Sequence, residues 1–267
     1  VVPWFANAGR LPREDAFGIG GDDSKPGDIK IAVPVFSRIA NFDDLDPLRA
    51  EPDVSVVMVR AGDALPGDAD LILLPGSKAT LADLDFVRTH GWDIDIAAHV
   101  RRGGAVLGIC GGYQMLGRSI TDPDGLEGPP GTVKGLGLLD IDTRLTPVKT
   151  LRPVGGMALG ARFTGYEMHM GESSGPGMAR PFARFDDGQA DGAIDPTGQV
   201  MGSYVHGLLA MGDMRAALLA RIGVAGGGAD HGASVDAALN AIAAQMEAHL
   251  DVDAMVALAT AKRGKIA

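Results

Sequence analysis

One cysteine is all that this sequence of 267 residues contains. A single thiol cannot form a disulfide within the chain, so nothing points to a disulfide-stapled secreted protein, and we expect a reducing, cytoplasmic setting. Apolar runs long enough for a transmembrane helix are also lacking, and we expect no membrane partner. The formal net charge of −10, uninterrupted by any basic cluster, argues against nucleic acid as a partner.

Nucleotide and metal signatures are missing as well. No G-x-x-x-x-G-K-[ST] segment occurs, so the chain has no P-loop of its own. No cluster of cysteine and histidine residues suggests a zinc site. Neither an internal repeat nor a heptad array is present. We therefore expect no cofactor and no metal in this chain.

What the sequence does have is the composition of an ordinary globular core, with 46% hydrophobic and 22% charged residues. Near-continuous apolar runs alternate with helix-like segments up to about residue 110, and this alternation predicts a parallel sheet covered on both faces. The fold class is α/β, flavodoxin-like or Rossmann-like. The expected strands are 31–35, 54–59, 71–74 and 105–109, and the expected helices are 81–89 and 94–102.

The rest of the chain has a different pattern. Residues 120–204 are dense in turn residues, and their short strands predict an antiparallel extension of the sheet's edge. The candidates are 136–143, 163–169, 181–185 and 200–204. After Gly212 the chain is expected to be helical, with a break at 226–228. An apolar stripe there predicts a packed helix face; its members are Val235, Leu239, Ile242, Met246 and Leu250.

Three parts follow from these patterns. Residues 1–27 are rich in proline and glycine and are predicted to be an arm from a missing upstream domain. Residues 28–225 form the main domain. Residues 226–267 form a C-terminal helical extension.

The segment 105–117 reads as strand, sharp turn and helix, with Cys110 at the turn. This is the pattern of a nucleophile elbow, in which a strained turn holds one reactive side chain clear of the sheet. Gly108, Gly111 and Gly112 flank the cysteine and allow close packing. A helix N-terminus also favours a thiolate. Cys110 is therefore predicted to be a nucleophile rather than a buried apolar residue.

A cysteine nucleophile needs a base, and six histidines are available: His90, His99, His169, His206, His231 and His249. Four of them fall in polar helical or glycine-rich segments, where we expect them to be solvated. His169 and His206 fall at or near the ends of predicted strands. His206 is the better candidate because it ends an apolar strand and Gly207 follows it.

Acyl transfer also needs backbone N–H donors that form an oxyanion hole. The N–H after the nucleophile, that of Gly111, is the usual first donor in an elbow. The turn at Gly76 and Ser77 ends a neighbouring strand and could supply the second donor.

With these features placed, the chain resembles the C-terminal part of the cobyric acid synthase (CobQ-type) family, glutamine amidotransferases of cobalamin biosynthesis. The similarity extends over nearly all of the chain. Its markers are the segments LPGSK (74–78), GICGGYQMLG (108–117), GYEMHMG (165–171) and YVHGL (204–208). Residues 1–4 and 11–15 also resemble the segment that follows the family's N-terminal synthetase domain.

The resemblance implies that Cys110 attacks the side-chain amide of glutamine while His206 transfers protons, which releases ammonia through a glutamyl thioester. It further implies an N-terminal synthetase domain of the same protein as partner. That domain would use ATP and magnesium to activate corrin carboxylates, such as those of adenosylcobyrinic acid a,c-diamide.

One departure from the wider class concerns the third catalytic member. Most class I amidotransferases carry a glutamate two residues after the histidine, and this chain has Leu208 there. Catalysis would rest on a dyad or on a carboxylate from elsewhere, with Glu167 as a possible orienter. Other residues of the resembling segments are expected to bind substrate; they are Ser77, Gln114, Glu167 and His169.

Two alternatives stay open at this point. A sister branch could act on cobyrinate or on a cell-wall lipid precursor. The domain could also be an amidotransferase-like interaction module without catalysis, although the presence of both Cys110 and His206 speaks against it.

Overall fold

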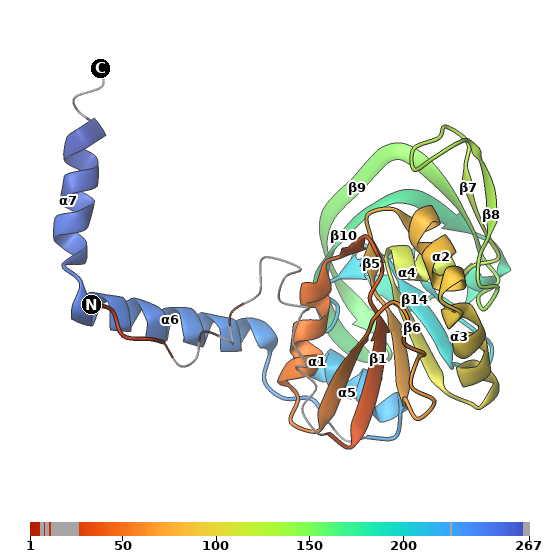
Figure 1. The fold of residues 1–267 in the computed structure, drawn as a ribbon, viewed down its shortest axis with the longest axis horizontal. Coiled ribbons are helices and arrows are strands. Elements are labelled where there is room, and N and C mark those ends of the chain that lie inside the picture. The colour runs from red at the N-terminus through yellow and green to blue at the C-terminus, as the bar shows by residue number, and fades with distance from the viewer. Residues whose placement is uncertain (6–7, 9–10, 12–26, 225, 264–267) are drawn as a thin grey trace.

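A computed structural model describes residues 1–5, 8, 11, 27–224 and 226–263. Its core is a six-stranded sheet in the order β13-β14-β6-β4-β1-β3 (Figure 1). Neighbouring strands from β14 to β3 are parallel, and β13 is an antiparallel edge strand. In that order the strands span Ala193–Ile194, Val200–Ser203, Ala105–Ile109, Leu71–Leu74, Ile29–Pro34 and Val54–Val59.

Helices cover both faces of this sheet, because alternate strand residues point to opposite sides. Leu71 and Leu73 pack in one apolar cluster with α1 (Asp46–Ala50) and α5 (Gly212–Arg221). Ile72 and Leu74 pack in a second cluster; its helices are α2 (Thr80–Thr89), α3 (Trp92–Arg101) and α4 (Gly111–Leu116). The predicted α/β class with a mostly parallel sheet is confirmed.

The later strands differ from the prediction. Apart from β13 and β14, they form a separate sheet in the order β12-β11-β9-β10-β15, in which β7 also pairs with β9 and β8 pairs with β7. Its centre is a long hairpin of β9 (Asp142–Ala158) and β10 (Ala161–Ser174), turning at Leu159 and Gly160, which both have positive φ. The remaining strands are β7 (Ser119–Asp122), β8 (Gly131–Lys134), β11 (Ala183–Phe185), β12 (Ala190–Asp191) and β15 (Val205–His206).

The expected strand 136–143 was therefore wrong, since β9 begins only at Asp142. The segment before it instead donates backbone hydrogen bonds to the carbonyls that end α4, as from Leu138 and Leu139 to Leu116. The remaining short elements are β2 (Ile39–Ala40), the 3₁₀ turn η3 (Phe42–Leu45), β5 (Gly76–Ser77) and the 3₁₀ turn η4 (Pro176–Ala179).

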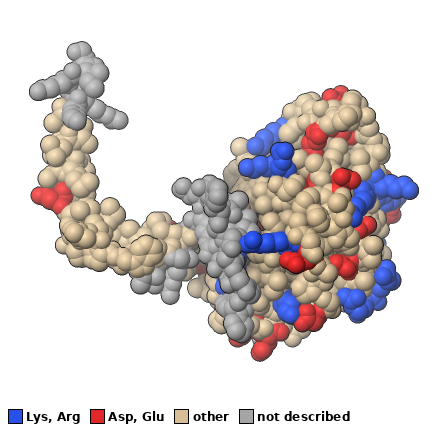
Figure 2. Space-filling view, viewed as in Figure 1, with Lys and Arg blue, Asp and Glu red and all other residues tan. Residues whose placement is uncertain are grey.

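Two C-terminal helices, α6 (His231–His249) and α7 (Val252–Arg263), extend away from the body as an arm (Figure 1). The predicted packed face on α6 was wrong for this chain. Ala238 is the buried residue of α6, and Leu239 and Met246 of the stripe are 50% and 42% exposed. On the face seen in Figure 2, the described part of the arm shows little charge. The apolar residues of α6 thus recur with a helical period, but in the described part of the chain nothing covers much of the face that they form.

The N-terminal residues lie beside this arm, where Gln245 Nε2 donates to Pro3 O at 2.7 Å. Most of the predicted segment 1–27 falls outside the described residues. Across the described residues, no helix combines the length and apolar character needed to cross a membrane.

Candidate active site

Cys110 occupies the turn between β6 and α4 with φ 51° and ψ −109°. Positive φ is costly for a residue with a Cβ, so the surrounding contacts must hold this turn in place. The Cys110 N–H donates to Ser203 O at 2.8 Å. The sulfur lies 3.5 Å from Met168 O of β10, across the opening between the two sheets. The thiol is thereby held at the carboxyl end of the parallel sheet, where such folds bind ligands.

The glycines around the cysteine are required by close backbone packing. A Cβ added at Gly112 would lie 2.2 Å from Leu74 O, and one at Gly108 would lie 2.7 Å from Gly112 O. Both contacts are with backbone atoms, which cannot rotate away. The elbow therefore stays tight against β4 and fixes the position of Cys110.

We predict that Gly112→Ala lowers the free energy of unfolding by about 2–4 kcal/mol, because the added methyl forces α4 away from β4. Urea unfolding followed by circular dichroism measures this change. Gly232→Ala is the matched control, because a Cβ there meets nothing within 4 Å and the residue lies in α6. The control should be neutral or more stable by about 0.5–1 kcal/mol. Equal effects of the two changes would contradict the packing argument.

His206, at the end of β15, has a fully buried ring with a carboxylate partner from far away in the sequence. Its Nδ1 lies 2.7 Å from Asp44 Oδ2, and the other oxygen of Asp44 accepts the Gly207 N–H at 2.6 Å. Tyr166 stacks on the imidazole with ring centroids 5.4 Å apart. Asp44 thus fixes both the ring and the backbone that follows it.

The charge state of His206 follows from these contacts. Burial lowers its pKa, but the hydrogen bonds to Asp44 and with Cys110 outweigh burial and raise the pKa to about 10. The imidazole is therefore protonated at neutral pH. A protonated imidazole beside the sulfur has a proton ready for a leaving group.

Asp44 is the carboxylate that the sequence left unassigned. It lies in η3, only 7% exposed, in a polar stretch that gave no signal of a link to His206. Glu167, the candidate orienter, instead pairs with Arg152, with Arg152 Nε 2.5 Å from Glu167 Oε2. The expectation that Glu167 orients His206 was therefore wrong, because Asp44 holds the imidazole instead.

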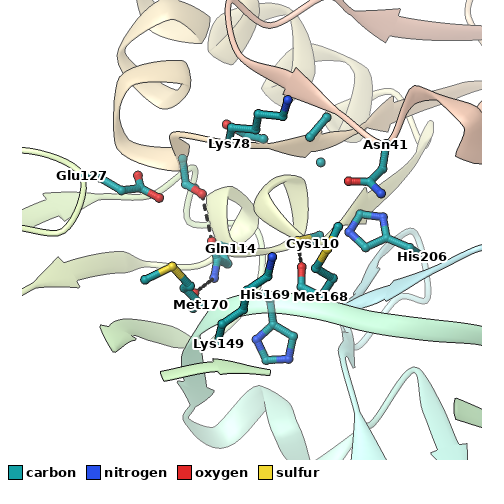
Figure 3. Close-up of a pocket in the computed structure, with 14 residues that line it drawn as sticks. Asn41, Lys78, Cys110, Gln114, Glu127, Lys149, Met168, His169, Met170 and His206 are labelled. Atoms are coloured by element: carbon teal, nitrogen blue, oxygen red, sulfur yellow. Dashed lines mark hydrogen bonds between the residues drawn. The ribbon is translucent and has the colours of Figure 1, made fainter. Parts of the chain in front are cut away.

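A cavity of about 350 Å³ opens at Cys110 and His206 (Figure 3). Of the predicted substrate residues, Ser77, Gln114 and His169 line it, and Glu167 is not among its lining residues. The imidazole of His169 points away from the cavity in Figure 3. That ring stacks on Tyr204 with centroids 3.8 Å apart, and its Nδ1 lies 3.0 Å from Gly171 O.

Gln114 is held within this cavity wall by contacts at both ends of its amide. Its Oε1 accepts from Thr80 Oγ1 at 3.0 Å, and its Nε2 donates to Met170 O at 3.0 Å. Gln114 therefore links α2, α4 and β10 at the cavity. The Ser77 hydroxyl, also at the cavity, donates to Asp83 Oδ2 at 2.6 Å.

The two predicted oxyanion donors come from adjoining pieces of backbone. Gly76 packs so closely on His206 that an added Cβ would lie 3.1 Å from the imidazole Cε1. A Cβ on Gly111 would lie 2.9 Å from the backbone nitrogen of Ser77. Gly111 is also the first residue of α4, where N–H groups lack intrahelical partners. Their role as donors stays a prediction.

The remaining histidines lie outside the cavity. His99 was expected to be solvated, but it is 3% exposed, and its Nε2 lies 2.9 Å from Ala105 O. Burial lowers the pKa of His99, consistent with a neutral structural ring. The described residues contain no group of three or more histidine, cysteine, aspartate or glutamate side chains suited to a metal ion.

Comparison with known proteins assigns this arrangement to a family. The model of the CobB/CobQ-like glutamine amidotransferase domain matches residues 30–214. A cobyric acid synthase of Rhizorhabdus wittichii is 65% identical over 98% of this chain and 54% of its own length, and one of Novosphingobium aromaticivorans is 58% identical over the same shares. The chain thus spans about half the length of these curated relatives.

A solved structure, PurLQS from Thermotoga maritima, shares the fold with a TM-score of 0.53 at 19% identity. That match covers 80% of this chain and 99% of the other. The family match, the relatives and the shared fold agree with one another. The chain belongs to the CobB/CobQ-like glutamine amidotransferase family.

Proposed function

We propose that this chain is the glutaminase part of a cobyric acid synthase, which hydrolyses glutamine to glutamate and ammonia. The observation that carries the proposal is the strained Cys110 at one cavity with His206, whose ring is fixed by Asp44. The cobyric acid synthases at 65% and 58% identity support the assignment within the family.

In the first half-reaction, the Cys110 thiolate attacks the amide carbon of glutamine, and the carbonyl π electrons move to oxygen. Backbone N–H groups of the Gly76 and Gly111 segments would stabilise that oxyanion. Protonated His206 then gives its proton to the amide nitrogen. The C–N bond breaks, ammonia leaves and a glutamyl thioester remains on Cys110.

In the second half-reaction, neutral His206 removes a proton from water, and the resulting hydroxide attacks the thioester carbon. The C–S bond breaks, which releases glutamate and restores the thiolate beside protonated His206. Asp44 compensates the ring's positive charge in both halves, because its Oδ2 lies 2.7 Å from Nδ1.

The ammonia is proposed to serve a synthetase domain in the other half of the protein. There, ATP and magnesium would activate corrin carboxylates for conversion to amides, in the cytoplasm. The uncovered apolar residues of α6, such as Leu239, are consistent with a further domain packing on the arm.

The test uses the intact protein with amide-¹⁵N glutamine, ATP, magnesium and adenosylcobyrinic acid a,c-diamide. We expect ¹⁵N in the amides of the corrin product and one glutamate formed for each amide. An excess of unlabelled ammonium, with glutamine omitted, should support the reaction when Cys110 is replaced by alanine. Glutamine hydrolysis without any corrin amidation would move the assignment to a sister branch, and absence of both would contradict the proposal.

A further inference from the structure

The chain crosses between the parallel sheet and the second sheet at two neighbouring places. The first crossing (191–193) leads from β12 to β13, and the second crossing (203–205) leads from β14 to β15. The two are in close contact, because a Cβ added at Gly192 would collide with Gly202 O. Cys110 follows β6 of the parallel sheet, whereas His206 belongs to β15 of the other sheet. The second crossing therefore helps to set where the imidazole lies relative to the sulfur.

Ser203 begins the second crossing and contacts both sides of the site. Its carbonyl oxygen accepts the Cys110 N–H at 2.8 Å. Its hydroxyl oxygen accepts the N–H of Val205, the residue before His206, at 3.1 Å. One serine thus holds the backbone of the nucleophile and the backbone that leads to the imidazole.

Asp191 ties the first crossing to the second. Its Oδ2 accepts the Ser203 hydroxyl at 2.5 Å and the Tyr204 N–H at 3.2 Å. The residue is 4% exposed, and no ion pair in the described part of the chain includes it. A carboxylate oxygen can accept two donors at once, and a hydrogen bond to an ionised acceptor is stronger than one between neutral groups. Asp191 is therefore a buried anion that binds the start of the second crossing.

This buried charge opposes folding. Burial, together with the nearby Glu167 carboxylate, raises the pKa of Asp191 to about 6, although the hydrogen bonds from Ser203 and Tyr204 and the ring of His169 act to lower it. An aspartate in an unfolded chain has a pKa of about 4. Because the folded chain holds the proton more tightly, stability falls as pH rises from about 4 to 6 and stays lower at neutral pH. A group that costs stability beside a reactive site suits a role in function better than a role in folding.

We propose that Asp191 and Ser203 are positioning residues, which join the two crossings and thereby hold the Cys110 sulfur and the His206 imidazole in reacting geometry. This inference rests on the proposed glutaminase function and deepens it. Neither residue lines the cavity, so both act through the backbone of the dyad and not by touching glutamine. Rate is sensitive to such placement, since a displacement of about 1 Å can cost about 100-fold.

The test uses Asp191→Asn and Ser203→Ala in the intact protein, with Ser203→Thr as the variant that keeps the hydroxyl. Asp195→Asn is the matched control for the carboxylate. Asp195 also accepts a hydroxyl at 2.5 Å, from Thr197, and a backbone N–H at 2.9 Å, from Val200, but it lies in the turn between β13 and β14. Ser55→Ala is the control for the hydroxyl, because Ser55 is 7% exposed in the edge strand β3.

We expect Asp191→Asn and Ser203→Ala each to lower kcat for glutamine hydrolysis about 10-fold or more, while the KM for glutamine stays near the wild-type value. Ser203→Thr should recover most of the loss, and both controls should match the wild type. Wild-type kcat in Asp191→Asn, an equal loss in Asp195→Asn, or no recovery in Ser203→Thr would each contradict the proposal. Urea unfolding at neutral pH should show that Asp191→Asn is no less stable than the wild type, since the buried charge is gone.

The pH dependence of kcat separates positioning from a structural role. In the wild type, kcat should fall as pH drops below about 6, because protonation of Asp191 weakens its hold on Ser203. Asp191→Asn should lack this fall, since it has no carboxylate to protonate. The other titratable groups that face Asp191 remain in the variant; they are Glu167, His169, Tyr204 and Tyr113. The same fall in both proteins would assign it to another group and contradict the role of Asp191.

Crystal structures without glutamine test the placement apart from turnover. In Asp191→Asn and Ser203→Ala, the separation of the Cys110 sulfur from the His206 ring should differ from the wild type by about 0.5–1 Å, and in the two controls it should not. Failure of the wild type to hydrolyse glutamine, with these displacements present, would contradict the proposed function alone. An unchanged separation in both crossing variants would overturn the positioning role.

Discussion

Replacing Cys110 by alanine is expected to lower glutamine hydrolysis by at least about 10³-fold, because no other group can form the thioester. The substitution removes only the sulfur of a residue that is 8% exposed, so the fold should persist. Glutamate release, followed with a coupled dehydrogenase assay, measures the loss. The Kd for glutamine should change little, since the other cavity residues remain.

Covalent labelling gives an independent readout of the same prediction. A diazoketone analogue of glutamine should add once to the wild-type chain, and peptide mass spectrometry should place the adduct on Cys110. This chain has no other cysteine, so a thioether found within it identifies the nucleophile directly. Hydrolysis by Cys110→Ala at the wild-type rate would contradict the mechanism, as would an adduct on another residue.

The parts of this site that could be predicted from the sequence are local ones. The elbow around Cys110 depends on a strand, three glycines and a helix within one short segment, and β6, the positive φ of Cys110 and α4 follow in that order. The approach of the Ser77 backbone to Gly111, beside Cys110, could also be expected, because strands β4 and β6 are parallel neighbours whose carboxyl ends meet.

Asp44 could not be predicted in the same way. It is separated from His206 by 162 residues and lies in a 3₁₀ turn, not at the end of a regular strand. Asp43 and Asp44 are adjacent and chemically equal in the sequence. Only the turn geometry decides which of them reaches the imidazole, and turn geometry is poorly encoded in local composition.

For α6 the sequence pattern was correct and the predicted packing was not. A helical period of apolar residues indicates that one face of a helix is suited to burial, but it does not indicate which surface covers that face. Leu239 and Met246 are substantially exposed in this chain, which spans about half the length of its curated relatives. A pattern in one half of a protein can thus be satisfied by the other half.

Asp44→Asn is expected to lower kcat by between about 10² and 10⁴-fold while leaving the KM for glutamine near the wild-type value. The amide is almost isosteric, but it carries no charge to offset a protonated ring, and it can present an N–H to Nδ1 in place of an acceptor. Asp43→Asn is the matched control, because it removes the same charge from the adjacent residue without breaking the 2.7 Å contact. A similar loss of kcat in both variants would contradict a specific role of the Asp44–His206 contact, because it would show that any negative charge in this turn has the same effect.

The pH dependence of stability and of kcat tests the contact between Asp44 and His206 as well. The pKa of His206 is raised from 6.5 to about 10, so the stability gained from its protonated form is fully present below pH 6.5 and is lost as pH rises toward 10. In Asp44→Asn the pKa of His206 should fall, because burial then opposes the charge with one fewer compensating bond. Urea unfolding between about pH 6 and 10 should show a steep decline for the wild type and for Asp43→Asn, and a flatter one for Asp44→Asn. The alkaline limb of kcat should move to lower pH in that variant alone, because the proton that His206 gives to the leaving nitrogen is held there by Asp44.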